Sequence, residues 1–148
     1  MLDRAKIGEV FPTFVVPVET GRLRFFAKSI GEKNPIYTDE SAARDAGYKA
    51  LPAPPTFPMV LDMESDSDLP PEVEVLKMDV GRILHGSQEF EYFGQVYAGD
   101  DISVSRKLVD VFDKKNGALE FVVTETSYTN QEHQLLAKAR CTLVYRNA

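Results

Sequence analysis

Long segments in which apolar and polar residues alternate dominate the second half of the sequence. The alternation has a period of two residues, which is typical of β-strands with one buried face. Two polar stretches separate neighbouring segments, Lys115-Asn116-Gly117 and residues 129–133, and the first strongly favours a hairpin. Long strands that follow one another through short turns form an antiparallel sheet. The predicted strands cover residues 73–78, 82–93, 101–113, 119–128 and 135–145.

The first half of the sequence has helical patterns instead. Residues 20–30 repeat apolar side chains at helical spacing up to Gly31, which can cap a helix end. A second helix is predicted over residues 38–46, with Thr38 as its N-cap. Residues 57–63, which Thr56 can open, are apolar nearly all round and predict a buried helix around which the sheet wraps.

Two connecting segments complete this α+β pattern. Residues 11–16 predict a first strand, with Pro12 favouring an edge position. Residues 64–72 are acidic and contain two prolines, so they predict an exposed loop. A chain of 148 residues is one domain by length, and we expect a single domain over residues 1–148, an antiparallel sheet wrapped around a central apolar helix.

A polar turn between the first two predicted helices carries residue types that acid–base chemistry uses. It reads Gly31-Glu32-Lys33-Asn34-Pro35 and leads to Tyr37. Polar side chains on such irregular backbone can gather around a substrate. The turn resembles the hydratase motif of the MaoC-like (R)-specific enoyl-CoA hydratases and 3-hydroxyacyl-thioester dehydratases, Gly-Asp-x-Asn-Pro-x-His. The Asp and His of that motif are the catalytic pair, and Glu32 and Tyr37 stand at their positions here.

Two later segments extend the resemblance over nearly the whole chain. They are Ala53-Pro54-Pro55-Thr56-Phe57 and His85-Gly86-Ser87-Gln88-Glu89-Phe90. Together with the turn they are most similar to the N-terminal FAS1-type dehydratase domains and to the mycobacterial fatty-acid dehydratase subunits that pair with a separate catalytic subunit. The resemblance implies a hotdog fold. It also implies substrate-binding roles for Asn34, Pro55, Thr56, Phe57, His85, Gly86 and Gln88.

Each residue of the turn also has a purely structural interpretation. Glu32 is either a general acid or base or a solvated carboxylate. Tyr37 can donate its hydroxyl to a thioester carbonyl, but a phenol is a poor proton shuttle at neutral pH, which favours packing with one hydrogen bond. Asn34 is expected to brace the turn through bonds from its side chain to the backbone.

Pro55 and His85 raise two further questions about the chemistry. Thioester chemistry needs hydrogen-bond donors for an oxyanion, and the catalytic relatives have a glycine where Pro55 aligns here, although proline has no N–H. If the alignment shifts by one, Thr56 or Phe57 still donates. His85 is expected to line the substrate groove or a subunit contact, and Gly86 permits close approach by a ligand or by another backbone.

Three functions are compatible with these residues. The first is a subunit of a 3-hydroxyacyl-thioester dehydratase or enoyl-thioester hydratase that binds acyl-CoA or acyl-carrier-protein thioesters, while a MaoC-like partner supplies the catalytic Asp and His. The second is a self-sufficient homodimeric hydratase that uses Glu32. The third is a non-enzymatic hotdog module that binds acyl thioesters or lipids.

Composition argues against several other classes. The net charge of -6 and the absence of a dense Lys/Arg stripe argue against nucleic-acid binding. Cys141 is the only cysteine, which excludes an internal disulfide, and we expect no metal and no cofactor. No apolar run approaches the length of a membrane span and the first residues lack an apolar segment, so we expect a cytoplasmic protein that does not contact the membrane.

Overall fold

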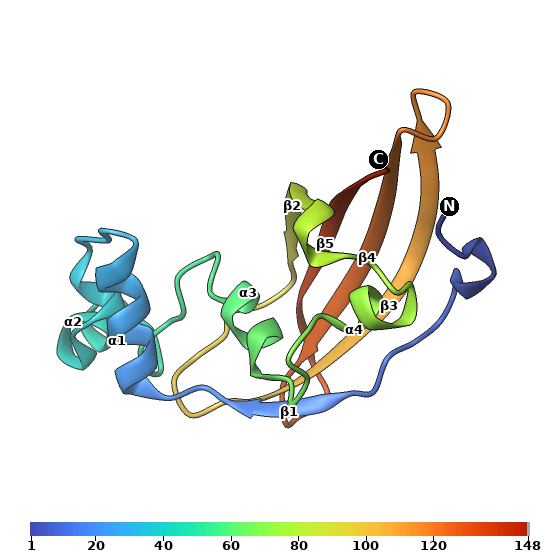
Figure 1. The fold of residues 1–148 in the computed structure, drawn as a ribbon. Helices are drawn as coiled ribbons and strands as arrows, with labels where there is room; N and C mark the ends of the chain where they lie inside the picture. The colour runs from blue at the N-terminus through green and yellow to red at the C-terminus, as the bar shows by residue number, and fades with distance from the viewer. Residues whose placement is uncertain (148) are drawn as a thin grey trace.

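An antiparallel sheet of five strands forms the body of the protein in a computed structural model that describes residues 1–147 (Figure 1). The strand order is β1-β3-β4-β5-β2. The three inner strands are long, while β1 is short, so β2 is the longer of the two edges. The strands are β1 (Phe14–Pro17), β2 (Ile83–Tyr92), β3 (Asp101–Lys114), β4 (Leu119–Thr129) and β5 (Leu135–Arg146).

The four predicted strands after residue 80 are confirmed, and so is the hairpin between β3 and β4. Lys115, Asn116 and Gly117 all have positive φ, at 54°, 55° and 83°. Asparagine and glycine tolerate this left-handed region, which explains the turn at this position. The strand predicted over residues 11–16 begins further along the sequence, at Phe14, and is β1.

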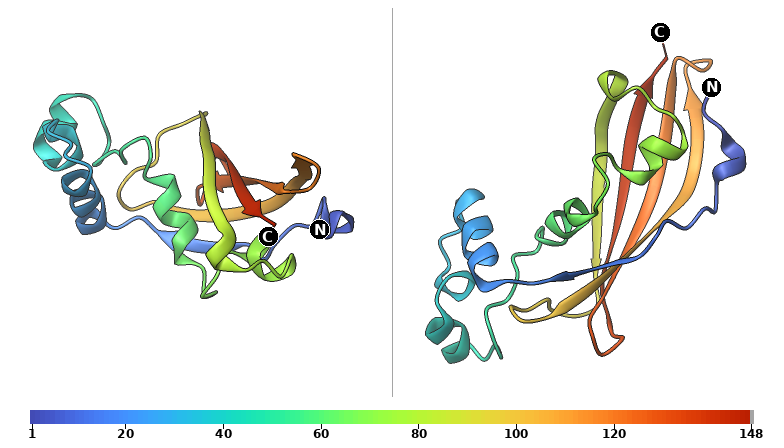
Figure 2. Two further views of the ribbon diagram at one scale, coloured as in Figure 1. Left: turned by 45° about the horizontal axis from the view of Figure 1, so that its top comes forward. Right: turned by 60° about the horizontal axis from the view of Figure 1, so that its bottom comes forward.

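Two helices lie together at the end of the molecule away from the sheet (Figures 1 and 2). The first is α1 (Thr20–Ser29), as predicted. The second, α2 (Glu40–Asp45), begins one residue later than expected, because the Asp39 carboxylate and not Thr38 accepts the N–H groups of Ser41 and Ala42. No helix among residues 1–147 is long and apolar enough to cross a membrane.

The predicted central helix is shorter and less buried than the sequence indicates. Its regular part, α3 (Pro58–Leu61), is a single turn, and a 3-10 turn over Asp62–Glu64 follows. Phe57 and Leu61 are fully buried, but the side chains of Met59 and Met63 are 36% and 70% exposed. The segment therefore lies on the sheet with one apolar face and leaves the other face open.

The predicted strand over residues 73–78 is wrong, because this segment contains the helix α4 (Pro71–Val75). Pro71 occupies the first helical turn, where its missing N–H is not needed. Val73 and Leu76 are buried three residues apart, which a helix achieves and a strand does not. Glu72, expected in an exposed loop, is only 3% exposed.

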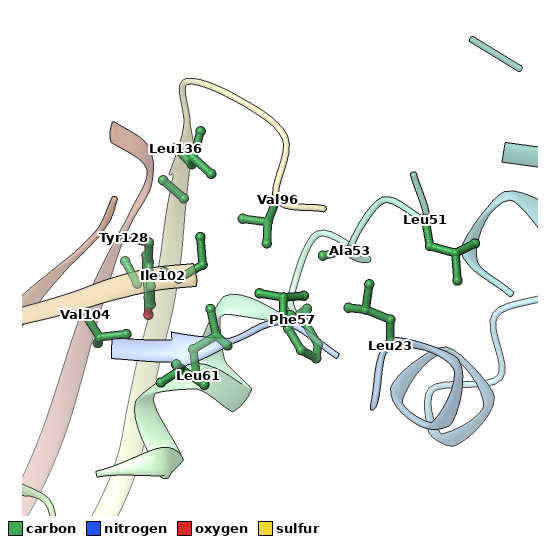
Figure 3. Close-up of a cluster of buried hydrophobic side chains, with 14 of the residues drawn as sticks. Leu23, Leu51, Ala53, Phe57, Leu61, Val96, Ile102, Val104, Tyr128 and Leu136 are labelled. Carbon is green, nitrogen blue, oxygen red and sulfur yellow. The ribbon is translucent and has the colours of Figure 1, made fainter. Parts of the chain in front are cut away.

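Buried side chains form two neighbouring clusters. The larger cluster joins α1 and α3 to the sheet and includes Leu23, Phe57, Leu61, Val104 and Tyr128 (Figure 3). The second cluster packs Val73, Leu76 and Met78 against β3 and β4. The segment over residues 57–76, here called the cover segment, thus contributes to both clusters and holds α3 and α4 over one face of the sheet.

Candidate functional site

The turn that contains Glu32, at the position of the family's catalytic aspartate, is braced by its own side chains. Gly31, at φ 72°, ends α1 with the N–H groups of Gly31 and Glu32 donating to the carbonyls of Lys28 and Ala27. The Glu32 Oε1 atom then accepts the backbone N–H groups of Lys33 and Asn34, both at 2.8 Å. The Glu32 carboxylate therefore holds the turn in place.

Asn34 and Tyr37 complete this turn. The Asn34 Oδ1 atom accepts the N–H of Ile36 at 3.2 Å, the bracing bond that the sequence predicts. Burial, and to a smaller extent the nearby Glu32 carboxylate, raise the pKa of Tyr37 above its usual value of 10. Its hydroxyl is therefore protonated at neutral pH, so it can donate a hydrogen bond but cannot accept a proton from a substrate.

The proline-rich approach to α3, residues 51–55, runs beside the segment that follows β2, where Pro52 forms an isolated antiparallel bridge with Tyr97. The Ala53 N–H donates to the Val96 carbonyl at 2.8 Å, and the Tyr92 hydroxyl donates to the Pro55 carbonyl at 2.6 Å. The Phe57 N–H donates to the Pro54 carbonyl at 2.9 Å. A ligand therefore cannot use the N–H of Phe57 without breaking that bond.

The three candidate residues of this approach differ in what they offer a ligand. Pro55 lines a cavity of about 240 Å³ with Tyr92. The Phe57 side chain is part of the core and meets the Phe26 ring edge-on at 5.5 Å. Thr56 is exposed, and its N–H is the remaining candidate donor here.

A bulge in β2 brings two other candidate residues together. The register against β5 shifts between His85 and Ser87, so Gly86 is the extra residue. His85 Nε2 and Gln88 Oε1 lie 3.4 Å apart, and both side chains line one cavity. Gly86 faces the β5 backbone: a Cβ atom there would stand 2.9 Å from the Thr142 carbonyl oxygen.

Replacing Gly86 by alanine should lower the free energy of unfolding by about 1 to 3 kcal/mol, since the new methyl group overpacks a backbone that cannot move aside. Urea unfolding monitored by circular dichroism measures the change. Gly21→Ala is the matched control, because a Cβ atom at this helical position meets nothing within 4 Å. It should stabilise the protein by about 0.4 to 1 kcal/mol. An equal effect of the two substitutions would contradict the close approach at Gly86.

The cavity that His85 and Gln88 line is a candidate binding site for an apolar ligand. It has a volume of about 320 Å³, lies between the cover segment and the sheet, and is here called the β2 cavity. Burial raises the pKa of the Cys141 thiol in its wall to about 11, which keeps that sulfur neutral and unreactive. Its apolar walls are formed by Met59, Met63, Leu69 and Leu143.

A buried ion-pair network lies at the inner side of this cavity. Arg106 of β3 contacts Asp62 through Nη2 at 3.0 Å and Glu72 through Nη1 at 3.1 Å. Arg106 Nε donates to Thr126 Oγ1 at 3.3 Å, and the Tyr128 hydroxyl donates to Asp62 Oδ1 at 2.9 Å. Burial raises the pKa of Asp62, against the opposing effect of Arg106. Burial opposes the charged form of Arg106, but the two carboxylates outweigh it and raise the pKa of Arg106, so the guanidinium stays charged.

Sequence reasoning missed this network entirely. One local signal existed: Arg106 stands between Val104 and Leu108 at an inward-facing position of its strand, where a charged residue needs a buried partner. Among residues 1–147, no group of three or more His, Cys, Asp or Glu side chains could hold a metal ion.

The candidate residues therefore occupy three places. His85 and Gln88 share the β2 cavity, and Pro55 meets Tyr92 of β2 at the neighbouring cavity. Glu32, Asn34 and Tyr37 lie between α1 and α2, at the end of the molecule away from the sheet (Figures 1 and 2). The two cavities are lined by other residues than these three.

Comparison with known proteins agrees with this architecture. The profile of the family described as "FAS1-like, dehydratase domain region" matches residues 5–139. A UPF0336 protein of Parafrankia sp. is 37% identical over 147 residues, which are 98% of this chain and 95% of the relative.

Two solved structures are complexes of two different subunits. The HadBC (3R-hydroxyacyl-ACP dehydratase) complex of Mycobacterium tuberculosis aligns at a TM-score of 0.77 and 30% identity, over 94% of this chain and 96% of the other. The ChsH1-ChsH2 complex of the same organism aligns at a TM-score of 0.77 and 22% identity, over 93% and 89%. Since the family profile and the relatives extend over nearly all of its length, this chain belongs to the FAS1-like dehydratase domain family and has the hotdog fold.

Proposed function

We propose that this chain is the substrate-binding subunit of a 3-hydroxyacyl-thioester dehydratase, which also runs as an (R)-specific enoyl-thioester hydratase. In this proposal a second hotdog subunit supplies the catalytic Asp and His. One observation carries the proposal: the carboxylate at the acid position is used to brace its own turn, while an apolar cavity opens elsewhere under the cover segment.

The chemistry explains why the turn by itself is a weak catalyst. Adding or removing water next to a thioester needs one group that accepts a proton and one that returns it. Glu32 Oε1 already receives two backbone N–H groups, and Tyr37 remains a neutral phenol at neutral pH. Neither residue replaces an imidazole, which titrates near neutrality.

The β2 cavity suits the acyl part of the substrate. The exposed surface of a ligand pocket is mostly apolar, with a few convergent polar groups. The surface of the β2 cavity is mostly apolar as well, although its lining includes polar residues such as Ser65, Asp68 and Thr124 besides His85 and Gln88. His85 and Gln88 belong to an edge strand, so they can also meet the thioester or a partner subunit. In this proposal Asn34 keeps its bracing role, and Thr56 is the backbone donor closest in sequence to the family's glycine.

The edge of β2 is the proposed contact with the second subunit. Nine of the ten residues of this strand pair with β5 on one side, and among residues 1–147 no strand pairs with the other side. Leu84, Tyr92 and Phe93 are each about half exposed along it. Long apolar edges invite pairing with another sheet. HadBC is a complex, and its similarity to this chain supports a heterodimer here over a homodimer.

The test is an assay with crotonyl-CoA and longer enoyl-CoAs, with the chain alone and with any MaoC-like protein that is encoded beside it. We expect the two proteins to co-elute, the chain alone to show no turnover, and the complex to reach about 1 to 10³ turnovers per second. In the complex, Glu32→Gln should leave the rate within about twofold, because the glutamine oxygen can accept the same two N–H groups.

The matched comparison is the partner's catalytic aspartate, whose loss should lower the rate by about 10²-fold or more. A drop of that size in Glu32→Gln would favour the self-sufficient enzyme. An absence of turnover in every combination, together with retained acyl-CoA binding, would favour a non-enzymatic binding module.

A further inference from the structure

A third cavity adjoins the β2 cavity at the ion-pair network. It has a volume of about 380 Å³ and is bordered by residues 11–14 at the start of β1, so it is here called the β1 cavity. Four residues line both cavities: Asp62, Ser65, Ser67 and Arg106. The Asp62–Arg106 ion pair therefore stands in the wall that separates them.

The acyl chain of a bound thioester cannot easily displace this wall. The guanidinium of Arg106 donates to Asp62, Glu72 and Thr126, and the side chains of the two acids are 16% and 4% exposed. Pushing the guanidinium aside would leave two buried carboxylates without their partner, which is strongly unfavourable. The wall also joins the cover segment to β3, so it cannot move without loosening the roof of the cavity.

We infer that the Asp62–Arg106–Glu72 network sets the maximum length of the acyl chain that this subunit accepts, by closing the inner end of the β2 cavity. The inference rests on the proposed function, because it takes the β2 cavity as the seat of the acyl chain. With the network in place only about 320 Å³ is available, at the low end of the range for ligand pockets. Without the network, the acyl chain would continue into the β1 cavity.

The test measures binding of saturated acyl-CoAs, from butyryl-CoA to stearoyl-CoA, by isothermal titration calorimetry on the chain and on its complex with the partner. These probes have no double bond to hydrate. For the wild-type protein, Kd should fall by about fourfold for each buried methylene up to a maximum acyl-chain length and should rise for longer acyl chains. The variant Asp62→Asn/Glu72→Leu/Arg106→Leu removes all three charges together, so no buried charge loses its partner. Its limit should move to longer chains, with unchanged affinity for short ones.

Thr13, which borders only the β1 cavity of the two, offers the matched control. In the wild-type protein, Thr13→Leu should leave the maximum acyl-chain length unchanged, because the acyl chain does not reach residue 13. In the triple variant, Thr13→Leu should shorten the maximum acyl-chain length, because the acyl chain then enters the β1 cavity. If the triple variant does not fold, Leu143→Phe decides the question, since filling the β2 cavity should shorten the wild-type limit while Thr13→Leu does not.

The inference is overturned if the triple variant keeps the wild-type limit, or if Thr13→Leu shortens the limit of the wild-type chain. The proposed function fails differently: neither the chain nor its complex would then bind any acyl-CoA, whatever its length. A limit that stays in place with normal binding therefore rejects the network as the stop and leaves the proposed function standing.

Discussion

Replacing Arg106 by alanine is expected to lower the free energy of unfolding by about 3 to 5 kcal/mol, the usual consequence of removing one partner from a buried ion pair. The Arg106 side chain is 13% exposed and lies between two carboxylates that are themselves nearly buried. Without the guanidinium, Asp62 and Glu72 repel each other in a medium that solvates neither. Urea unfolding with linear extrapolation measures the loss.

Arg44→Ala is the control for the loss of an arginine as such. Arg44 pairs with Glu40 at the same 3.1 Å, but the two side chains are 65% and 46% exposed, so water replaces the lost partner. Its removal should change the free energy of unfolding by no more than about 0.5 kcal/mol. The variant Asp62→Asn/Glu72→Leu/Arg106→Leu should recover most of the loss, because no charge is left buried alone. Equal effects of Arg44→Ala and Arg106→Ala would show that the network is hydrated.

Restoring the family's catalytic pair in this chain is expected to fail until a third residue is changed. Glu32→Asp with Tyr37→His supplies the acid–base pair, but Pro55 offers no N–H to the developing enolate oxygen. A missing oxyanion donor costs roughly 3 to 4 kcal/mol in the transition state. Adding Pro55→Gly to the double variant should therefore raise its hydration rate with crotonyl-CoA by about 10²- to 10³-fold.

Pro54→Gly in the same double variant is the matched control. It also adds one N–H to the approach to α3, but one residue before the position that aligns with the family's glycine, so it should bring no comparable gain. Steady-state rates of the four proteins, each checked for folding by circular dichroism, make the comparison. The idea would be refuted by a wild-type chain that alone turns over crotonyl-CoA at about 1 to 10³ per second.

Local patterns specified most of this fold. The strands β2 to β5 were predictable to within a residue or two at each end, because alternation along a strand is a property of neighbouring residues. The bracing bonds of Asn34 and the end of α1 at Gly31 were predictable for the same reason, since capping and turn formation involve atoms only a few residues apart.

Tertiary packing decided what the local patterns left ambiguous. A short apolar run such as residues 73–78 suits a buried strand or a helix equally well, and packing of Val73 and Leu76 over the sheet selected the helix. The apolar segment 57–63 became a single helical turn with an open face, since Asp62 turns to Arg106 instead of to solvent.

The candidate site divides in the same way. His85, Gly86 and Gln88 were visible in the sequence as a motif, but the cavity that two of them line exists only where β2, β5 and the cover segment meet. The inward-facing position of Arg106 indicated a buried partner, but nothing local identified that partner as Glu72, 34 residues away. The spacing of residues along the sequence indicates which face of a helix or strand a side chain occupies. The residue that this side chain contacts depends on strand register and on how separate layers pack. Only the folded chain could therefore reveal the ion-pair network and the two cavities it separates.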